Sequence, residues 1–151
     1  MKKVFALVLV FVCFLSSADA ESKFLAAYNE MGKYYGIKPV PESSAVDDSD
    51  EYYSFKTENV VVSISKDGST AIVASYDPMD FITHGILSGL IVSVNGDTDD
   101  VSRFYGLFME AYFALTAGQV VSSGAYNGKK FRMTYSDNRY CFLISDYANM
   151  N

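Results

Sequence analysis

The spacing of hydrophobic residues predicts an amphipathic helix near the start of the chain. Between residues 24 and 35, apolar side chains recur every three or four positions, which is the period of one helix face. These positions are Phe24, Leu25, Tyr28, Met31 and Tyr35. Ser22 can cap the helix at its start, and Gly36 followed by Pro39 supplies the signal that ends it.

Two segments with different patterns follow this helix. Residues 42–51 consist mostly of Ser, Asp and Glu, and because such a composition cannot bury much apolar surface, we predict an acidic loop. The stretches 52–56, 60–65 and 70–76 have the composition of β-strands and are separated by short turn sequences. Connections of this length join antiparallel neighbours, so we predict three antiparallel strands.

The next segment contains the only histidine of the chain, His84, with two carboxylates just before it. From Met79 onward the apolar residues have helical spacing. Asp77 then suits the N-cap, Pro78 the first helical position, and Asp80 the first turn. His84 lies four residues after Asp80, which suits a contact along one helix flank. Since the helix start explains both carboxylates, we interpret this cluster as structural rather than catalytic or metal-binding.

The remainder of the chain repeats the order of helix and strands. A helix begins near Thr98, where Asp99 and Asp100 fall in its first turn, and it ends at Gly118. Three further strands are predicted at 119–126, 129–135 and 139–146. Asn127-Gly128 is a strong two-residue hairpin signal. Apolar and polar residues alternate along 129–135, so one face of the sheet should be buried and the other solvated.

These elements give the order α-βββ-α-α-βββ. We therefore predict an α+β fold in which an antiparallel sheet of about six strands carries helices packed on one face. The two α-βββ units suggest an internal duplication, although they share no convincing sequence identity.

The N-terminal residues 1–20 have the pattern of a secretory signal peptide. Two lysines precede an apolar run, and Ala18-Asp19-Ala20 forms an Ala-x-Ala cleavage site. The apolar run is too short to cross a membrane, which needs about 20 residues. We expect an exported bacterial protein with a single mature domain, residues 21–151. The periplasm and the external medium remain open alternatives, because the same signal serves both.

Charge and cysteine content narrow the possible functions. Removal of residues 1–20 takes away two lysines and one aspartate, so the formal charge changes from −6 to −7. A negatively charged surface repels nucleic acid, so we expect no nucleic-acid partner. We also expect no membrane span in the mature chain. Cys13 would leave with the signal peptide, and Cys141 is expected to be a small buried residue within a strand.

Residues for catalysis do not form a recognisable group in the sequence. Any Ser-His-Asp scheme would have to use His84, and no Gly-x-Ser-x-Gly motif is present. Paired carboxylates could serve glycoside hydrolysis, but nothing in the sequence brings two of them together. We predict a protein that is not an enzyme and that needs no cofactor.

Two groups of residues are candidates for binding. The chain has 12 Tyr and no Trp, and Tyr combines a large contact area with a polar tip, so it is enriched at interfaces. Tyr34 and Tyr53 fall beside the apolar stripes, which makes them the best candidates for exposed contact residues. Asp97, Asp99 and Asp100 form an acid-rich turn that could hold calcium weakly, although it lacks the spacing of an EF-hand loop.

The layout resembles that of small exported bacterial proteins of unknown function. The resembling features are the segment Phe24-Leu25-Ala26-Ala27-Tyr28-Asn29-Glu30, the turn Ser65-Lys66-Asp67-Gly68, the helical middle and the Asn127-Gly128 hairpin. The resemblance implies an envelope or secreted module without established catalytic residues. We therefore expect a non-enzymatic module that binds a protein or an envelope component. The alternative is a secreted domain that binds a small ligand or Ca²⁺, and the sequence leaves the oligomeric state open.

Overall fold

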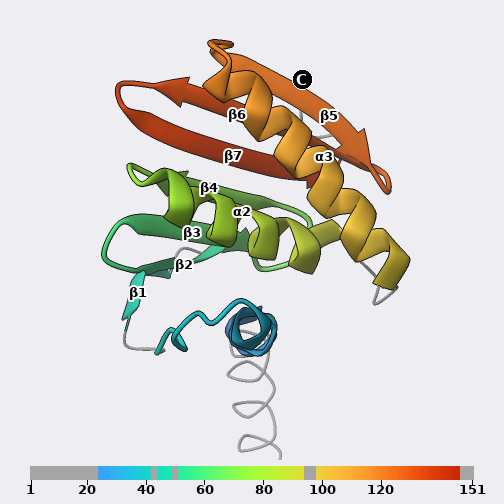
Figure 1. The fold of residues 1–151 in the computed structure, drawn as a ribbon. Coiled ribbons are helices and arrows are strands. Elements are labelled where there is room, and N and C mark those ends of the chain that lie inside the picture. Colours follow the sequence, from blue (N-terminus) through green and yellow to red (C-terminus); the bar gives the residue numbers. More distant parts are fainter. Residues whose placement is uncertain (1–23, 42–43, 49–50, 94–97, 147–151) are drawn as a thin grey trace, which may run out of the picture.

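The computed structural model describes residues 24–41, 44–48, 51–93 and 98–146 (Figure 1). For residues 45–48, 98 and 99 the description covers the backbone alone. The predicted signal peptide, residues 1–20, lies outside the described residues.

One antiparallel sheet of seven strands forms the framework of the molecule (Figure 1). The spatial order is β1-β2-β3-β4-β7-β6-β5, and each neighbouring pair is antiparallel. The strands are β1 (Ala45–Asp48), β2 (Tyr52–Lys56), β3 (Val60–Ser65), β4 (Ala71–Ser75), β5 (Val121–Tyr126), β6 (Lys129–Ser136) and β7 (Arg139–Asp146). The N-terminal strands and the C-terminal strands thus form two runs that meet where β4 pairs with β7.

In the described part of the chain, three helices cover one face of this sheet. They are the N-terminal helix, residues 24–34, then α2 (Pro78–Ser93) and α3 (Thr98–Thr116). In Figure 1, α2 lies in front of β3 and β4, while α3 lies in front of β5 and β6. Contacts also join α2 to β7. The predicted α+β class, the antiparallel sheet with helices on one face and the order α-βββ-α-α-βββ are confirmed.

The structure adds a strand within the segment 42–51, which we predicted to be an acidic loop. β1 pairs antiparallel with β2, with a shift in register between Ala45 and Asp47. Composition argues against a buried strand here, but a strand at the edge of a sheet needs backbone pairing on one side only. The acidic composition therefore did not exclude strand pairing at this edge.

The start of α2 has the predicted cap. The backbone N–H of Met79 donates to Asp77 Oδ1 at 2.7 Å, and the N–H of Asp80 donates to the same oxygen at 3.3 Å. Pro78 is the first residue of the helix, where its missing N–H leaves no hydrogen bond unmade.

The core lies between the helices and the sheet and is rich in aromatic rings. α2 and α3 approach each other closely at two glycines of α2. A Cβ built at Gly89 would lie 2.1 Å from Phe104 Cζ, and a Cβ at Gly85 would lie 2.7 Å from Phe108 Cζ. Phe104 and Phe108 are both fully buried. The absence of side chains at these two positions therefore makes room for two rings of α3.

Candidate interaction surface

The face of the sheet that none of the described helices covers is the most distinctive surface in the described part of the molecule. We call it the open face and define it as the residues of β2 to β7 that alternate with the core residues. Residues directly opposite each other in an antiparallel sheet point to the same side, so the register defines rows across this face. One row is Lys56, Val61, Ala74, Cys141, Thr134 and Val121. The next row is Ser54, Ser63, Ile72, Leu143, Arg132 and Ser123.

The middle of the open face is apolar. We call this group the apolar centre; it consists of Val61, Ile72, Ala74, Cys141 and Leu143. Val61 and Ile72 are each 38% exposed, and the other three are half-buried. In an antiparallel sheet with one solvated face, polar residues normally occupy these positions. The apolar centre therefore departs from the alternating pattern of a solvated face.

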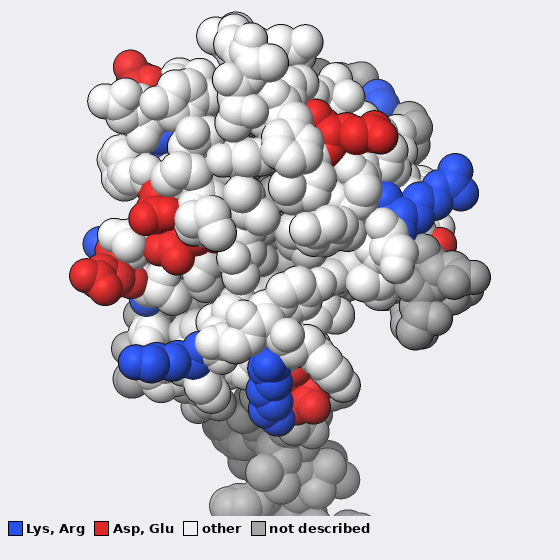
Figure 2. All heavy atoms as spheres, viewed as in Figure 1, with Lys and Arg blue, Asp and Glu red and all other residues white. Residues whose placement is uncertain are grey.

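Basic residues surround the apolar centre. This basic rim consists of Lys56, Lys130, Arg132 and Arg139, which come from β2, β6 and β7. Of the open-face positions in β2 to β7, all of which the structure describes, none holds Asp or Glu, whereas Asp47 of the edge strand β1 pairs with Ser54 at the border of this face. The formal charge of the whole chain is −6. By contrast, Figure 2 shows the helix-bearing side, where acidic and basic side chains both lie around a broad uncharged region.

A hollow lies at one corner of the open face. Its volume is about 310 Å³, and it is lined by Lys56, Glu58, Asn59, Val61, Ala74, Tyr76 and Arg139. The Arg139 Cζ lies 4.6 Å from the centroid of the Tyr76 ring, and the guanidinium also donates a hydrogen bond to the Tyr76 hydroxyl. This hydrogen bond raises the pKa of Arg139 above its ordinary value. Arg139 is therefore a permanent cation whose orientation is fixed by an aromatic neighbour.

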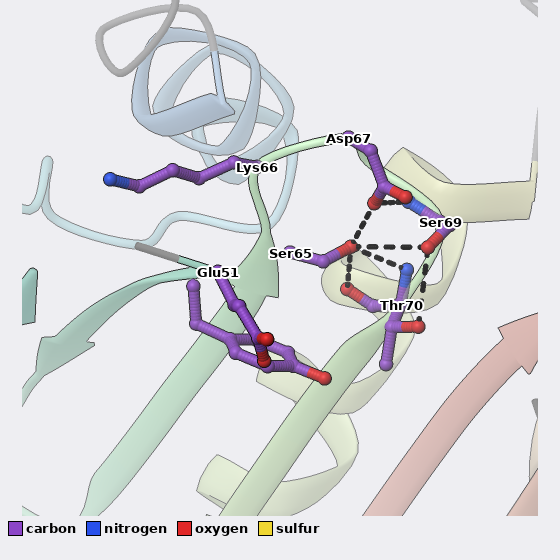
Figure 3. A pocket seen from close by; sticks show the side chains of 7 residues that line it. Glu51, Ser65, Lys66, Asp67, Ser69 and Thr70 are labelled. Carbon is purple, nitrogen blue, oxygen red and sulfur yellow. Dashed lines mark hydrogen bonds between the residues drawn. The ribbon is translucent and has the colours of Figure 1, made fainter. Parts of the chain in front are cut away.

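A second hollow, of about 340 Å³, lies at the turn between β3 and β4 (Figure 3). Its polar groups bond mainly to one another: Ser65 Oγ donates to Asp67 Oδ1 at 2.6 Å, and the Ser69 N–H donates to the same oxygen at 2.9 Å. These hydrogen bonds lower the pKa of Asp67 to about 2. Figure 3 shows Lys66 pointing away from this cluster. The arrangement stabilises the turn and explains its polar residues without a ligand.

His84 links α2 to the N-terminal helix. Its side chain is 5% exposed, its Nδ1 is hydrogen-bonded to the Tyr28 hydroxyl, and the two rings stack with centroids 5.9 Å apart. Burial lowers the pKa of His84, while the nearby Asp80 charge opposes this effect. Asp80 Oδ2 accepts a hydrogen bond from Asn59 Nδ2 at 3.0 Å. Within the described part of the chain, no group of three or more His, Cys, Asp or Glu side chains could hold a metal ion.

The two predicted contact tyrosines lie in different environments. Tyr34 is 85% exposed on the N-terminal helix, so its predicted exposure is confirmed. The predicted exposure of Tyr53 is wrong, because Tyr53 is 7% exposed. Tyr53 lies opposite Ile64 in the sheet and on the same face as Phe55, which places its ring in the core. The two residues therefore share no surface.

The other predicted positions give less information about a site. Asp97 and the side chain of Asp99 lie outside the described residues. The Asp100 carboxylate accepts a hydrogen bond from the Tyr126 hydroxyl, which ties α3 to the end of β5. Cys141 is half-buried on the open face, so the expectation of a buried cysteine is wrong.

The sequence predicted a sheet face without helices, but as a solvated face, and the apolar centre was missed although the sequence contains a signal for it. Ile72 alternates with the core residues Ala71 and Val73 of β4, so it falls at a position where a polar residue is expected. Val61 has the same relation to Val60 and Val62 in β3.

Comparison with known proteins gives no relative from which a function could be transferred. No family model matches the chain, and no match was found among curated proteins or solved structures.

Among the helices that the structure describes, none has the length and apolar character required to cross a membrane.

Proposed function

We propose that this protein is an exported, non-enzymatic bacterial interaction module that binds a partner protein on its open face. This proposal rests on one observation: the apolar centre lies on the sheet face that none of the described helices covers. Export rests on the signal-peptide pattern of residues 1–20.

The arrangement of the open face has the anatomy of a protein interface. Such interfaces combine an apolar central area with a polar rim. Here Val61, Ile72 and Leu143 occupy the centre, and hydroxyl-bearing and basic residues surround them. Removing apolar area from water contributes about 25 cal/mol per Å². A partner that covers the centre would therefore gain free energy that the unbound protein leaves unrealised.

Cys141 provides a direct test because its thiol lies within the apolar centre. The partner would be captured from the envelope or medium by mild cross-linking, purified, and added to the protein before treatment with a thiol-alkylating reagent. Mass spectrometry would then measure the alkylation of Cys141 specifically. We expect a saturating partner to slow this reaction. A Ser102→Cys variant places a thiol on an exposed position of α3 and should react at the same rate with and without partner.

Substitutions at the apolar centre provide the second test. Val61→Thr with Ile72→Thr keeps β-branched residues in the strands but removes apolar surface. We expect the double variant to bind the partner more weakly while its urea unfolding midpoint changes little. Phe113→Ser is the matched control, because Phe113 is 60% exposed on α3, away from the open face. The proposal would be contradicted if the double variant bound the partner as well as the unchanged protein does and if saturating partner did not slow the alkylation of Cys141.

Tyr34 offers a different contact surface, which its 85% exposure supports. The same binding assay tests it with Tyr34→Ser. If this substitution weakens binding and the open-face double variant does not, the partner binds the N-terminal helix instead.

A further inference from the structure

The charges of the open face define the chemistry of its partner. We propose that the open face binds an acidic protein segment, whose Asp and Glu side chains contact the basic rim while its aliphatic side chains cover the apolar centre. This inference rests on the proposed function and specifies the partner.

Cations lie on opposite sides of the apolar centre. Lys56 lies opposite Val61, and Arg132 lies opposite Leu143, so cations flank the apolar centre from two strands on opposite sides. Arg139 precedes Cys141 by two residues on β7 and therefore points to the same face. A partner with carboxylates around an aliphatic middle matches this arrangement in both charge and polarity.

The hollow beside Arg139 also suits a carboxylate. A guanidinium can donate two parallel hydrogen bonds to one carboxylate. Because the Arg139 guanidinium already stacks on the Tyr76 ring, its side chain loses less conformational entropy when a partner binds. The hollow of about 310 Å³ has room for an acidic side chain next to Arg139 and Lys56. Glu58 also lines it and would repel an incoming carboxylate. Removal of the Glu58 charge should therefore strengthen binding.

Two other occupants fit the face less well. A second copy of the chain docked symmetrically would bring the two basic rims together, and like charges at an interface oppose association. A bilayer surface is usually engaged by aromatic or long aliphatic side chains that insert below the headgroups. The apolar centre instead consists of half-buried or partly exposed Val, Ile, Ala, Cys and Leu side chains within strands. An acidic protein segment satisfies both the rim and the centre.

The test uses a fluorescein-labelled peptide of alternating Glu and Val, compared with a Lys and Val peptide of equal length. Fluorescence anisotropy would measure binding to the purified protein at low and high salt. We expect the acidic peptide to bind, the basic peptide not to bind, and high salt to weaken binding by about tenfold, since exposed charges are screened. Arg132→Glu and Lys56→Glu should each weaken binding by about tenfold, and Glu58→Gln should strengthen it.

Arg103→Glu is the matched control, because it makes the same change in net charge at an exposed position of α3. We expect it to leave binding of the acidic peptide within about twofold. Equal losses in Arg103→Glu and Arg132→Glu would overturn the inference, because binding would then follow net charge rather than the open face. Failure of the acidic peptide to bind would also overturn the inference. So would binding of the protein only to vesicles that contain phosphatidylglycerol, or salt-sensitive self-association of the protein through its open face.

The captured partner separates this inference from the proposed function. If the partner protects Cys141 but its binding is insensitive to salt and to Arg132→Glu, the open face is the interface and the acidic chemistry is wrong. If acidic-peptide binding is lost in Arg132→Glu while the captured partner leaves Cys141 reactive, the proposed function fails and the anion-binding character of the face stands.

Discussion

The close approach of α2 and α3 predicts that an alanine at Gly89 destabilises the fold, although alanine normally favours a helix. In an unhindered helix interior, Gly→Ala is stabilising by up to about 1 kcal/mol. At Gly89 the added Cβ would lie 2.1 Å from Phe104 Cζ and 2.4 Å from Phe104 Cε1. The shorter distance is about 1.3 Å less than the 3.4 Å at which ordinary contact begins.

The surroundings of Phe104 determine whether the ring can give way. Phe104 is fully buried, and its ring centroid lies 6.0 Å from that of Tyr126, 6.3 Å from that of Phe108 and 6.4 Å from that of Phe131. Relief of the overlap therefore requires movement of several rings or separation of the two helices. Overpacking of a dense core typically costs about 1–3 kcal/mol, and this overlap is severe. We expect a net loss of about 2 kcal/mol of unfolding free energy for Gly89→Ala.

Urea unfolding monitored by circular dichroism would measure this change, with Gly106→Ala as the matched control. Gly106 lies within α3, and a Cβ there would meet nothing within 4 Å. The control should therefore show the helix-propensity gain of up to about 1 kcal/mol without the steric cost. A double variant, Gly89→Ala with Phe104→Leu, should lose less stability than the sum of the two single variants, since the smaller side chain relieves the overlap.

Equal stabilisation by Gly89→Ala and Gly106→Ala would refute this reasoning. It would mean that the two helices can separate without measurable cost, and that the buried rings of α3 do not fix their distance.

Three further predictions concern single side chains. Asp77→Ala should lower the unfolding free energy by about 1 kcal/mol, because it removes the acceptor for two N–H groups at the start of α2, whereas Asp77→Asn should retain most of this stability in the same urea assay. Burial holds the pKa of His84 below its ordinary value of 6.5, so the unfolded chain binds more protons than the folded one as the pH falls below about 6.5. The unfolding free energy should therefore fall in that range, and His84→Gln should flatten this dependence; an unchanged pH profile would show that other groups cause it. The pKa of Asp67 is about 2 against an ordinary 3.8, so its contribution to stability is present above about pH 3.8 and is lost toward pH 2. An NMR titration of Ser65→Ala should show the pKa of Asp67 raised toward 3.8, and a pKa that stays near 2 would assign the shift to the Ser69 contacts.

Local signals in the sequence were sufficient to predict several elements. The start of α2 followed from Asp77 and Pro78, because capping depends on residues next to each other in the chain. The hairpin between β5 and β6 followed from Asn127-Gly128, and both residues have the positive φ that this turn requires, 46° and 76°. Such features need no information about distant segments.

Features that depend on tertiary contacts were missed or wrongly placed. The α2–α3 contact at Gly89 depends on the ring of Phe104, and the sequence does not show that these residues meet. β1 was missed because its pairing comes from the β2 backbone rather than from its own composition. Tyr53 is a different case: its alternation with Ser54 and Phe55 already indicated the buried face, and the pairing opposite Ile64 confirms that period.

The pairing of β4 with β7 has a consequence for how the chain folds. Ala71 and Ile144 are partners in the middle of the sheet, although they lie 73 residues apart in the sequence. Each outer run of strands can form from neighbouring segments, but the central ladder also needs β7, which follows β4 by more than 60 residues. A growing chain therefore cannot complete this core until β7 is available. The late arrival of the C-terminal strand keeps the earlier part of the chain from reaching its final stability, and truncation before β7 should leave two partial sheets rather than a smaller stable domain.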